Sequence, residues 1–150
     1  MRKERRTHIE FFAGCGGMAI GMENAGFELE FANEISPMAA NTFAHNVLGV
    51  DLEAKSERTK WIHTKYKTKD YKLRLREDTL SHSEIENSDL DIENDKGLAT
   101  LKGSLLIGDI RKFKDQLIEA QIHDPYNGKL DLVSGGPPCQ SFSLAGRRER

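Results

Sequence analysis

Short apolar segments alternate with helix-forming segments along this chain, and this alternation is the feature that most limits its fold. Four apolar segments have the composition and brevity of strands: residues 9–12, 27–31, 105–107 and 130–133. Strands that alternate with helices form a parallel sheet with helices on its faces. We therefore predict an α/β fold built on a partial parallel sheet of four strands.

Three segments between these strands are predicted to be helices: residues 18–24, 38–47 and 112–122. Gly26 follows the first of them, as glycine often follows a helix end. Ser36 and Pro37 mark the start of the second. A serine hydroxyl can cap free N–H groups there, and proline lacks an N–H that the first turn does not need.

One connection in this pattern is far longer than an ordinary loop. It covers about residues 49–103 and is segregated by charge, with nine basic residues between 55 and 76 and eight acidic residues between 77 and 95. Trp61, Tyr66 and Tyr71 lie among the basic residues, which permits a surface that stacks on bases and meets phosphates. The alternative is a partly ordered surface insertion whose two halves attract each other and without which the sheet can fold.

Composition limits the function classes without choosing among them. A net charge of −2 over 150 residues neither supports nor excludes a nucleic-acid partner. No apolar run approaches the roughly 20 residues of a membrane span. The five histidines are scattered singly, so no metal site is predicted, and two cysteines do not make a disulfide framework. We expect a reduced, cytoplasmic protein.

Parallel α/β sheets bind ligands beyond the carboxyl ends of their strands. Four segments with special chemistry follow the four predicted strands: the glycine-rich loop 14–17, Glu34, Asp109 and Cys139. Glu34 follows the loop at roughly the interval at which an acidic residue binds a cofactor ribose. Residues 14–19 also fit the loose G-x-G-x-x-A pattern. The loop therefore suits S-adenosylmethionine and a dinucleotide equally, and a plain packing turn is a third interpretation.

The sequence Ser-Gly-Gly-Pro-Pro-Cys-Gln-Ser-Phe-Ser at residues 134–143 presents one thiol after the last predicted strand. Pro137 and Pro138 fix the backbone dihedral φ immediately before Cys139. A rigidly held thiol suits covalent catalysis, so Cys139 is a candidate nucleophile. The alternative, for this cysteine taken alone, is a small buried filler at a strand end.

Together with Ala-Gly-Arg at 145–147, this string resembles the catalytic signature of the cytosine-C5 DNA methyltransferases, in which a Pro-Cys-Gln tripeptide carries the nucleophile. Phe-Phe-Ala-Gly-Cys-Gly-Gly at 11–17 resembles the cofactor loop of that family, although Glu10 stands where the family commonly has aspartate. The resemblance covers residues 9–47 and 104–147 and leaves the insertion unmatched. It implies a Rossmann-like methyltransferase fold, with residues 1–150 as the amino-terminal part of the catalytic domain.

The resemblance also implies residue roles. Cys139 would add to C6 of a cytosine flipped out of double-stranded DNA, so that C5 can attack the methyl group of S-adenosylmethionine. Glu34 would meet the ribose and Asp109 the adenine amino group, and their alternatives are a surface carboxylate and a helix cap. The implied cofactor-binding residues are Phe12, Ala13, Gly14, Cys15, Gly16, Gly17, Glu34, Ile35, Asp109, Ile110 and Pro138. The implied DNA-contacting residues are Gln140, Ser141, Ser143 and Arg147.

Elements that the family carries after the nucleophile are absent from these 150 residues. They include the glutamate that protonates the base and the target-recognition domain. We therefore expect the isolated chain to be inactive, as a truncated product, a piece of a longer enzyme or one subunit of a split enzyme in a bacterial restriction-modification system. The alternative functions are a catalytically silent S-adenosylmethionine-binding module and a NAD-binding Rossmann protein with an incidental cysteine.

Overall fold

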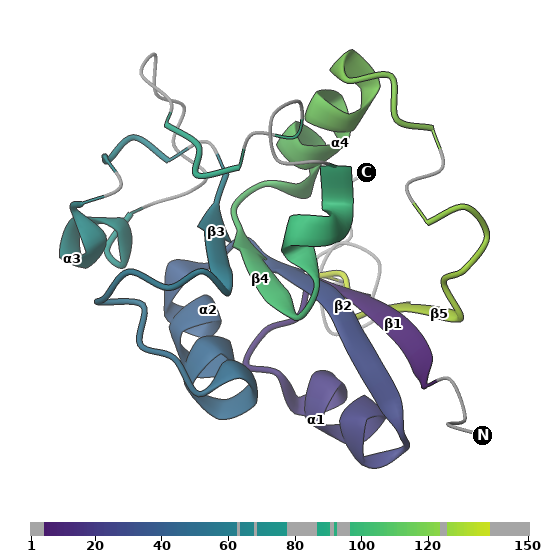
Figure 1. Cartoon of the computed structure of the whole chain (residues 1–150). Helices are drawn as coiled ribbons and strands as arrows, with labels where there is room; N and C mark the ends of the chain where they lie inside the picture. The colour runs from purple at the N-terminus through teal and green to yellow at the C-terminus, as the bar shows by residue number, and fades with distance from the viewer. Residues whose placement is uncertain are drawn as a thin grey trace, which may run out of the picture.

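The computed structural model describes residues 5–62, 64–67, 69–77, 87–90, 92, 97–123 and 126–138. Within them, five strands form one sheet in which every pairing is parallel (Figure 1). The strands are β1 (Arg6–Phe11), β2 (Phe27–Glu34), β3 (Thr59–Trp61), β4 (Ser104–Ile107) and β5 (Leu132–Gly135). Their order across the sheet is β3-β4-β2-β1-β5. The predicted parallel α/β fold is confirmed, but the prediction of four strands missed β3.

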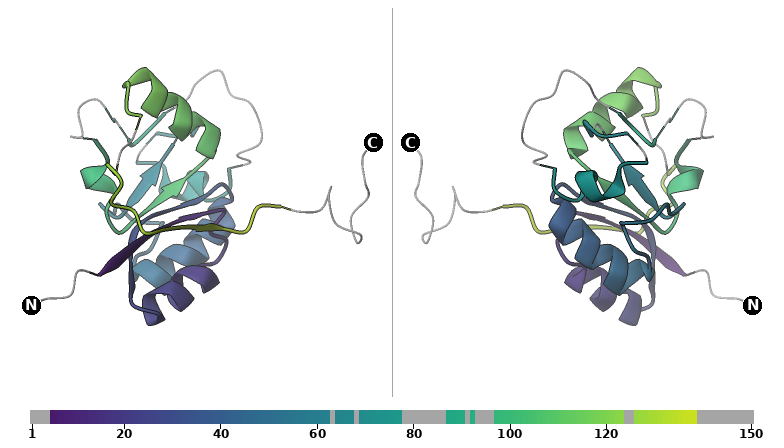
Figure 2. Two further views of the ribbon diagram at one scale, coloured as in Figure 1. Left: turned by 90° about the vertical axis from the view of Figure 1, so that its right-hand side faces the viewer. Right: turned by 90° about the vertical axis from the view of Figure 1, so that its left-hand side faces the viewer.

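Helices cover both faces of the sheet (Figure 2). The helices α1 (Gly17–Asn24) and α2 (Pro37–Phe43) lie on one face, and α4 (Ile110–Glu119) lies on the other. A π-helical turn, η1 (Ala44–Leu48), continues α2, and a 3-10 helix, η2 (Gly97–Leu101), precedes β4. All three predicted helices are present, although the third begins and ends earlier than predicted.

Ser36 occupies the predicted N-cap position of α2, but its hydroxyl makes no capping hydrogen bond. Its backbone N–H instead donates to the side chain of Glu34. The prediction of a hydroxyl cap is therefore wrong, because the chain uses the end of β2 to fix the start of this helix.

Alternating side chains of the central strands divide the core into two layers. Leu105, Ile107 and Ala32 belong to the cluster that packs against α1 and α2. Leu106 and Phe31 belong to the cluster that contains Phe113 of α4. Each of these strand residues is at most 1% exposed. Because helices cover both faces, β4 is buried on both sides, and it contains the continuous apolar run Leu105–Ile107.

The strand β3 lies inside the charged insertion and pairs with β4 at the sheet edge. Trp61 of this strand is 2% exposed and packs in the core, so the interpretation in which it stacks on a base is wrong for this residue. Ile62, Leu90 and Ile92, also from the insertion, are buried in the second cluster. This burial argues against the expectation that the sheet folds without the insertion.

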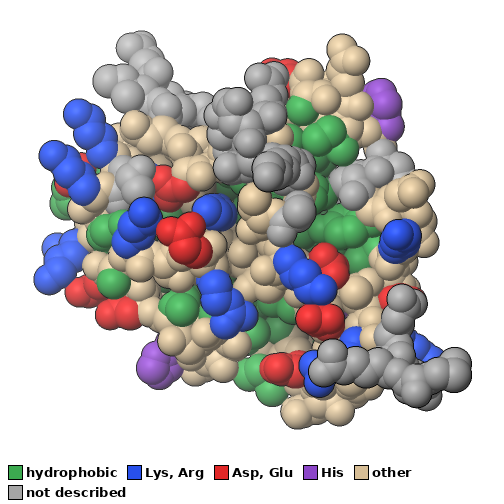
Figure 3. Space-filling view, viewed as in Figure 1, with side chains coloured by type: hydrophobic (Ala, Val, Ile, Leu, Met, Phe, Trp, Pro, Cys, Tyr) green, Lys and Arg blue, Asp and Glu red, His purple; other side chains and the backbone are tan. Residues whose placement is uncertain are grey.

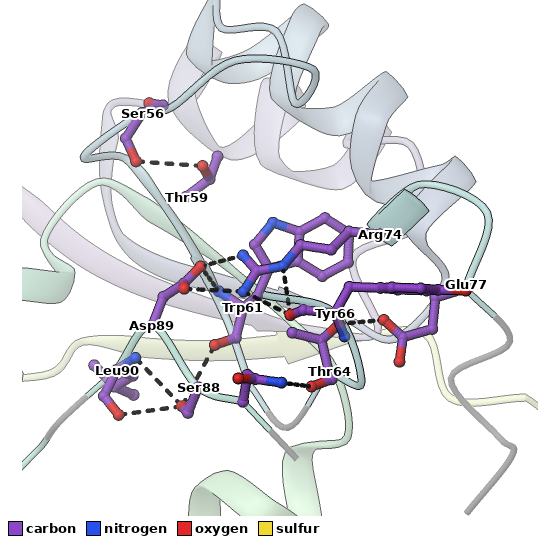
Figure 4. Close-up of polar contacts among 11 residues, drawn as sticks. Ser56, Thr59, Trp61, Thr64, Tyr66, Arg74, Glu77, Ser88, Asp89 and Leu90 are labelled. Atoms are coloured by element: carbon purple, nitrogen blue, oxygen red, sulfur yellow. Dashed lines mark hydrogen bonds and ion pairs between the residues drawn. The ribbon is translucent and has the colours of Figure 1, made fainter. Parts of the chain in front are cut away.

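A buried ion pair joins the basic and acidic halves of the insertion (Figure 4). Arg74 lies at the end of the short helix α3 (Tyr71–Arg74), and its side chain is fully buried. Its Nη1 and Nη2 donate to Asp89 at 2.6 and 3.1 Å, and its guanidinium lies 5.4 Å from the centre of the Trp61 ring. Asp89 in turn accepts from the backbone N–H of Trp61 at 3.3 Å. The expected attraction between the two halves is confirmed at this pair, which also fixes the β3 edge.

Replacing Asp89 tests the importance of this pair for stability. Asp89→Ala should destabilise the fold by about 3–5 kcal/mol, because the Arg74 guanidinium would stay buried without its counter-charge. Urea unfolding followed by the fluorescence of Trp61, the single tryptophan, measures the loss. As a control, Glu28→Ala removes an ion pair to Lys102 in which both side chains are substantially exposed, and it should change little. Unchanged stability of Asp89→Ala would contradict the structural role of the pair.

Candidate cofactor-binding site

The predicted site segments gather at the carboxyl edge of the sheet. The glycine loop follows β1, Glu34 is the last residue of β2, and Asp109 follows β4 after one glycine. The strand β5 ends at the same edge and leads to Pro138, which is exposed. Because all pairings are parallel, these strand ends are neighbours, as the sequence predicted.

The loop after β1 reverses direction sharply between strand and helix. Phe12, Gly14 and Gly16 have φ values of 55°, 56° and 91°, in the region that residues other than glycine rarely adopt. Ala13 within this turn is buried and donates its N–H to the carbonyl of Asn33 at 2.9 Å. A Cβ at Gly16 would lie 2.5 Å from a methyl group of Val47. The loop is therefore held against β2 and the helix that follows it.

The side chain of Glu34 ties this loop to the start of α2. Its Oε2 accepts the N–H of Gly14 and its Oε1 accepts the N–H of Ser36, both at 2.7 Å. The residue is only 8% exposed. Each carboxylate oxygen can accept more than one hydrogen bond, so both retain capacity for a ligand hydroxyl. Ile35, also predicted to bind cofactor, is half-buried beside it.

Asn33 makes a second set of bonds at this edge that the sequence analysis did not identify. Its Nδ2 donates to the carbonyls of Leu106 and Gly108 at 3.2 and 3.0 Å. The N–H of Gly108 donates to the carbonyl of Glu34 at 2.9 Å. Asn33 is 2% exposed, so it positions the strand ends rather than contacting a ligand. The signal in the sequence was an amide immediately before Glu34, at the end of an apolar strand.

Asp109 caps α4 in this structure. Its Oδ1 accepts the N–H of Arg111 at 2.9 Å, and its Oδ2 lies 2.6 Å from Nη2 of the same arginine. The side-chain hydrogen bond from Arg111 is the main cause that lowers the pKa of Asp109. The helix-cap interpretation is thus confirmed, and the contact of Asp109 with an adenine stays a prediction. Ile110, the other residue predicted here, begins the helix and is half-buried.

Two further polar side chains lie buried on the α1 face of β1. Glu10 is 2% exposed, and its Oε2 has no hydrogen-bond partner. Burial raises the pKa of Glu10 to about 7, against the opposing effect of a hydrogen bond from the backbone of Ala19. His8 is fully buried with neither ring nitrogen bonded, and burial lowers its pKa. The sequence analysis did not include this pair among the site residues.

The raised pKa of Glu10 predicts how stability depends on pH. The folded state keeps this proton up to about pH 7, whereas the unfolded state loses it near the ordinary value of 4.5. The unfolded state therefore binds fewer protons within that window, and this group makes stability fall as pH rises. Glu10→Gln should abolish that fall and be more stable than the wild type by about 1–3 kcal/mol above neutral pH.

Urea unfolding of both proteins at several pH values between about 4 and 8 measures this difference. The lowered pKa of His8 acts in the opposite direction below pH 6.5, but it is common to both proteins and cancels in the comparison. Glu119→Gln, at an exposed carboxylate on α4, is the matched control. A stability difference that is the same at every pH would show that Glu10 does not titrate near neutrality.

The remaining predicted residues divide into two groups. Cys15 is exposed and Gly17 is the first residue of α1, so both lie on the loop as predicted. The proposed nucleophile Cys139 and the proposed DNA contacts Gln140, Ser141, Ser143 and Arg147 lie outside the described residues.

In the described part of the chain, no three His, Cys, Asp or Glu side chains gather as metal ligands do. The described helices include none with the length and apolarity to cross a membrane.

Comparison with known proteins adds family information to this geometry. The sequence matches the profile described as C-5 cytosine-specific DNA methylase over residues 6–75 and 87–150. This match includes most of the insertion, so the prediction that the insertion lies outside the resemblance is wrong. No solved structure matches the chain significantly.

Curated relatives cover nearly the whole chain. The type II methyltransferase M.AquIA of Picosynechococcus sp. is 30% identical over 93% of it, and M.NgoPII of Neisseria gonorrhoeae is 28% identical over 92%. DNA (cytosine-5)-methyltransferase 3 of Arabidopsis thaliana is 28% identical over 96%. The chain spans only 35%, 23% and 9% of the lengths of these three proteins.

Proposed function

The chain belongs to the C-5 cytosine-specific DNA methylase family, and from this we propose that it binds S-adenosylmethionine and supplies the cysteine nucleophile for the methylation of cytosine at C5 in DNA. The observation that carries the proposal is the Glu34 carboxylate, anchored beside the glycine loop at the edge where β5 leads to Cys139. The relatives named type II methyltransferases favour a restriction-modification system in a bacterial cytoplasm.

The residues at the edge suit such a cofactor. A Cβ at Gly14 or Gly17 would meet no atom within 4 Å, so the loop leaves open space on its outer side. Phe12 is 40% exposed there and offers an aromatic surface. The Glu34 oxygens can accept hydrogen bonds from ribose hydroxyls. When bound, S-adenosylmethionine supplies a methyl group activated by its positive sulfur.

Cys139 supplies the electrons that make this transfer feasible, because C5 of cytosine is by itself a poor nucleophile. Its thiolate forms a bond to C6, and the displaced electron pair lets C5 attack the methyl carbon, whose bond to the cofactor sulfur breaks so that S-adenosylhomocysteine leaves. Loss of the C5 proton then restores the ring and breaks the bond between C6 and sulfur. Gln140, Ser141, Ser143 and Arg147 hold the flipped cytosine and its flanking phosphates.

The matched relatives are much longer than this chain, so we propose that a complementary carboxy-terminal segment completes the enzyme. That segment supplies the glutamate that protonates the base and the domain that recognises the DNA site. The edge strand β5 supports this, because among the described residues it pairs only with β1 and its Val133 is 56% exposed. A further strand there would pair with the backbone N–H and C=O groups on the open edge of β5.

Calorimetry separates the proposed function from its alternatives. The wild-type chain should bind S-adenosylhomocysteine and not NAD, whereas a dinucleotide-binding protein would show the reverse. A catalytically silent binding module would bind S-adenosylhomocysteine but form no covalent product with DNA.

Gly17→Asp should weaken cofactor binding strongly without unfolding the chain. The open space at Gly17 accepts the side chain, and a carboxylate in the first turn of α1 suits the helix dipole. The same carboxylate would fill ligand space and repel Glu34, so affinity for S-adenosylhomocysteine should fall by about tenfold or more. Gly21→Asp, one turn later on α1 and equally unhindered, is the control and should keep its affinity. Equal affinity in both variants would refute the site.

Cys139→Ala should abolish covalent trapping of DNA. The chain mixed with its complementary segment should form an adduct with a duplex that carries 5-fluorocytosine, because fluorine at C5 blocks the final elimination. Cys15→Ala should keep most of that adduct, since Cys15 lies exposed on the cofactor loop and takes no part in the attack. Electrophoresis under denaturing conditions measures the adduct. An adduct formed by Cys139→Ala would show that the nucleophile is another residue.

A further inference from the structure

We propose that a basic loop in the insertion, residues 64–67 and 69–77 with α3 at its centre, is a second contact surface for the DNA backbone. This inference rests on the proposed function in one respect, that double-stranded DNA is the ligand. It extends that function because the resemblance places all DNA contacts after the nucleophile and leaves the insertion without a role.

The position of the basic loop is the first argument. The chain leaves β3 at the carboxyl end of the sheet and then enters the loop, and α3 flanks β3 at the side of the sheet away from β5 (Figure 1). The strands β3 and β5 are the two ends of the sheet, which is roughly 19 Å at about 4.8 Å between strands. A duplex advances about 3.4 Å per base pair, so this distance is about six base pairs. A duplex lying across the strand ends, with its target at Cys139, therefore reaches the basic loop with flanking phosphates.

The charge of the loop is the second argument. Residues 64–77 contain six basic and two acidic residues, in a chain whose net charge is −2. Lys67, Lys69 and Arg76 are exposed and make no ion pair with any described residue. Lys72 is 81% exposed and lies 3.7 Å from Glu53, a distance at which an exposed pair is weak. Lysine and arginine side chains gather over α3, at the left of the space-filling view (Figure 3).

Two other basic residues of the insertion, Lys60 and Arg58, are more firmly engaged. Lys60 is 17% exposed and lies 3.7 Å from Glu57. Lys55 lies 3.7 Å from the same residue, but the two side chains are 74% and 79% exposed, so that pair is weak. Arg58 donates to the carbonyls of Leu48 and Gly103 at 2.9 and 3.1 Å. Apart from Lys55 and Lys102, the weakly paired positive charge of the described insertion therefore lies on the basic loop.

Internal contacts hold the backbone of this loop in place. The buried Arg74 donates to the carbonyl of Tyr66 from Nε and Nη2, at 3.3 and 3.2 Å, and its Nη1 and Nη2 also donate to Asp89. Glu77 accepts the hydroxyl of Thr64 and the N–H of Lys65, the latter at 2.8 Å, so the two ends of the loop are joined. Asp89 and Glu77 therefore both make contacts within the insertion. The exposed side chains of Lys67 and Lys69 extend from a backbone that these contacts hold in place. A surface ordered before binding loses less conformational entropy on contact with DNA.

The test compares two triple variants of the 150-residue chain. Lys67→Gln, Lys69→Gln and Arg76→Gln together remove the free charges of the basic loop. Lys102→Gln, Lys114→Gln and Lys129→Gln together remove three positive charges outside the basic loop and are the matched control. Fluorescence anisotropy with a labelled duplex of about 20 base pairs measures affinity at several salt concentrations. Calorimetry with S-adenosylhomocysteine is performed on the same proteins.

The basic-loop variant should bind the duplex about tenfold more weakly at low salt, and the slope of log affinity against log salt should fall by about two to three, since each lost phosphate contact removes about 0.9. The control variant should keep both affinity and slope, and all three proteins should bind S-adenosylhomocysteine equally. An unchanged slope in the basic-loop variant, or equal losses in both variants, would overturn the inference. If no protein binds S-adenosylhomocysteine while the duplex result holds, the proposed cofactor function fails and the DNA surface stands.

Discussion

The carboxylate of Glu34 is the contact on which the site geometry depends. It accepts backbone N–H groups from Gly14 and Ser36 at 2.7 Å, and so joins the loop after β1 to the start of α2. Hydrogen bonds to an ionised acceptor are stronger than neutral ones, especially where the acceptor is removed from water. Both helix-bearing connections on this face are therefore fixed relative to the sheet through one side chain.

Asn33 and Gly108 extend this arrangement to the next strand. The amide of Asn33 bonds to two carbonyls at the end of β4, and Gly108 donates to the carbonyl of Glu34. A Cβ at Gly108 would lie 2.4 Å from the carbonyl oxygen of Ile62, so only glycine fits this approach of backbone to backbone. The ends of β1, β2, β4 and the segment after β3 are thus linked in a rigid edge. Such rigidity is what accurate placement of a reacting ligand requires.

Unsatisfied buried groups are uncommon in folded proteins and often mark functional positions. His8 and Glu10 are two such residues, on the face of β1 that α1 covers and directly before the glycine loop. A carboxyl group with a pKa near 7 at this place changes charge close to physiological pH. The loop and the first turn of α1 therefore follow directly after, and pack near, a Glu10 carboxyl group whose charge depends on pH.

The fold class and the location of the site could be predicted because they depend on local patterns. Apolar runs such as 105–107, helix signals such as Ser36 and Pro37, and the glycines of the loop act over a few residues. Together with the rule that parallel strands share a carboxyl edge, they placed Glu34 and Asp109 beside the loop without coordinates. The sequence by itself determined this much.

Tertiary structure decided the rest, because those contacts join residues far apart in the chain. The strand β3 has no apolar run and exists through its pairing with β4 and the burial of Trp61. Arg74 appeared as one of nine basic residues, yet it is buried against Asp89, which leaves its neighbours to form the basic loop. Charge pattern gives the number of charges in a segment, but only packing determines which of them lose water and find a partner. For the same reason the sequence could not show that Glu34 already binds the backbone N–H of Gly14, twenty residues earlier in the chain.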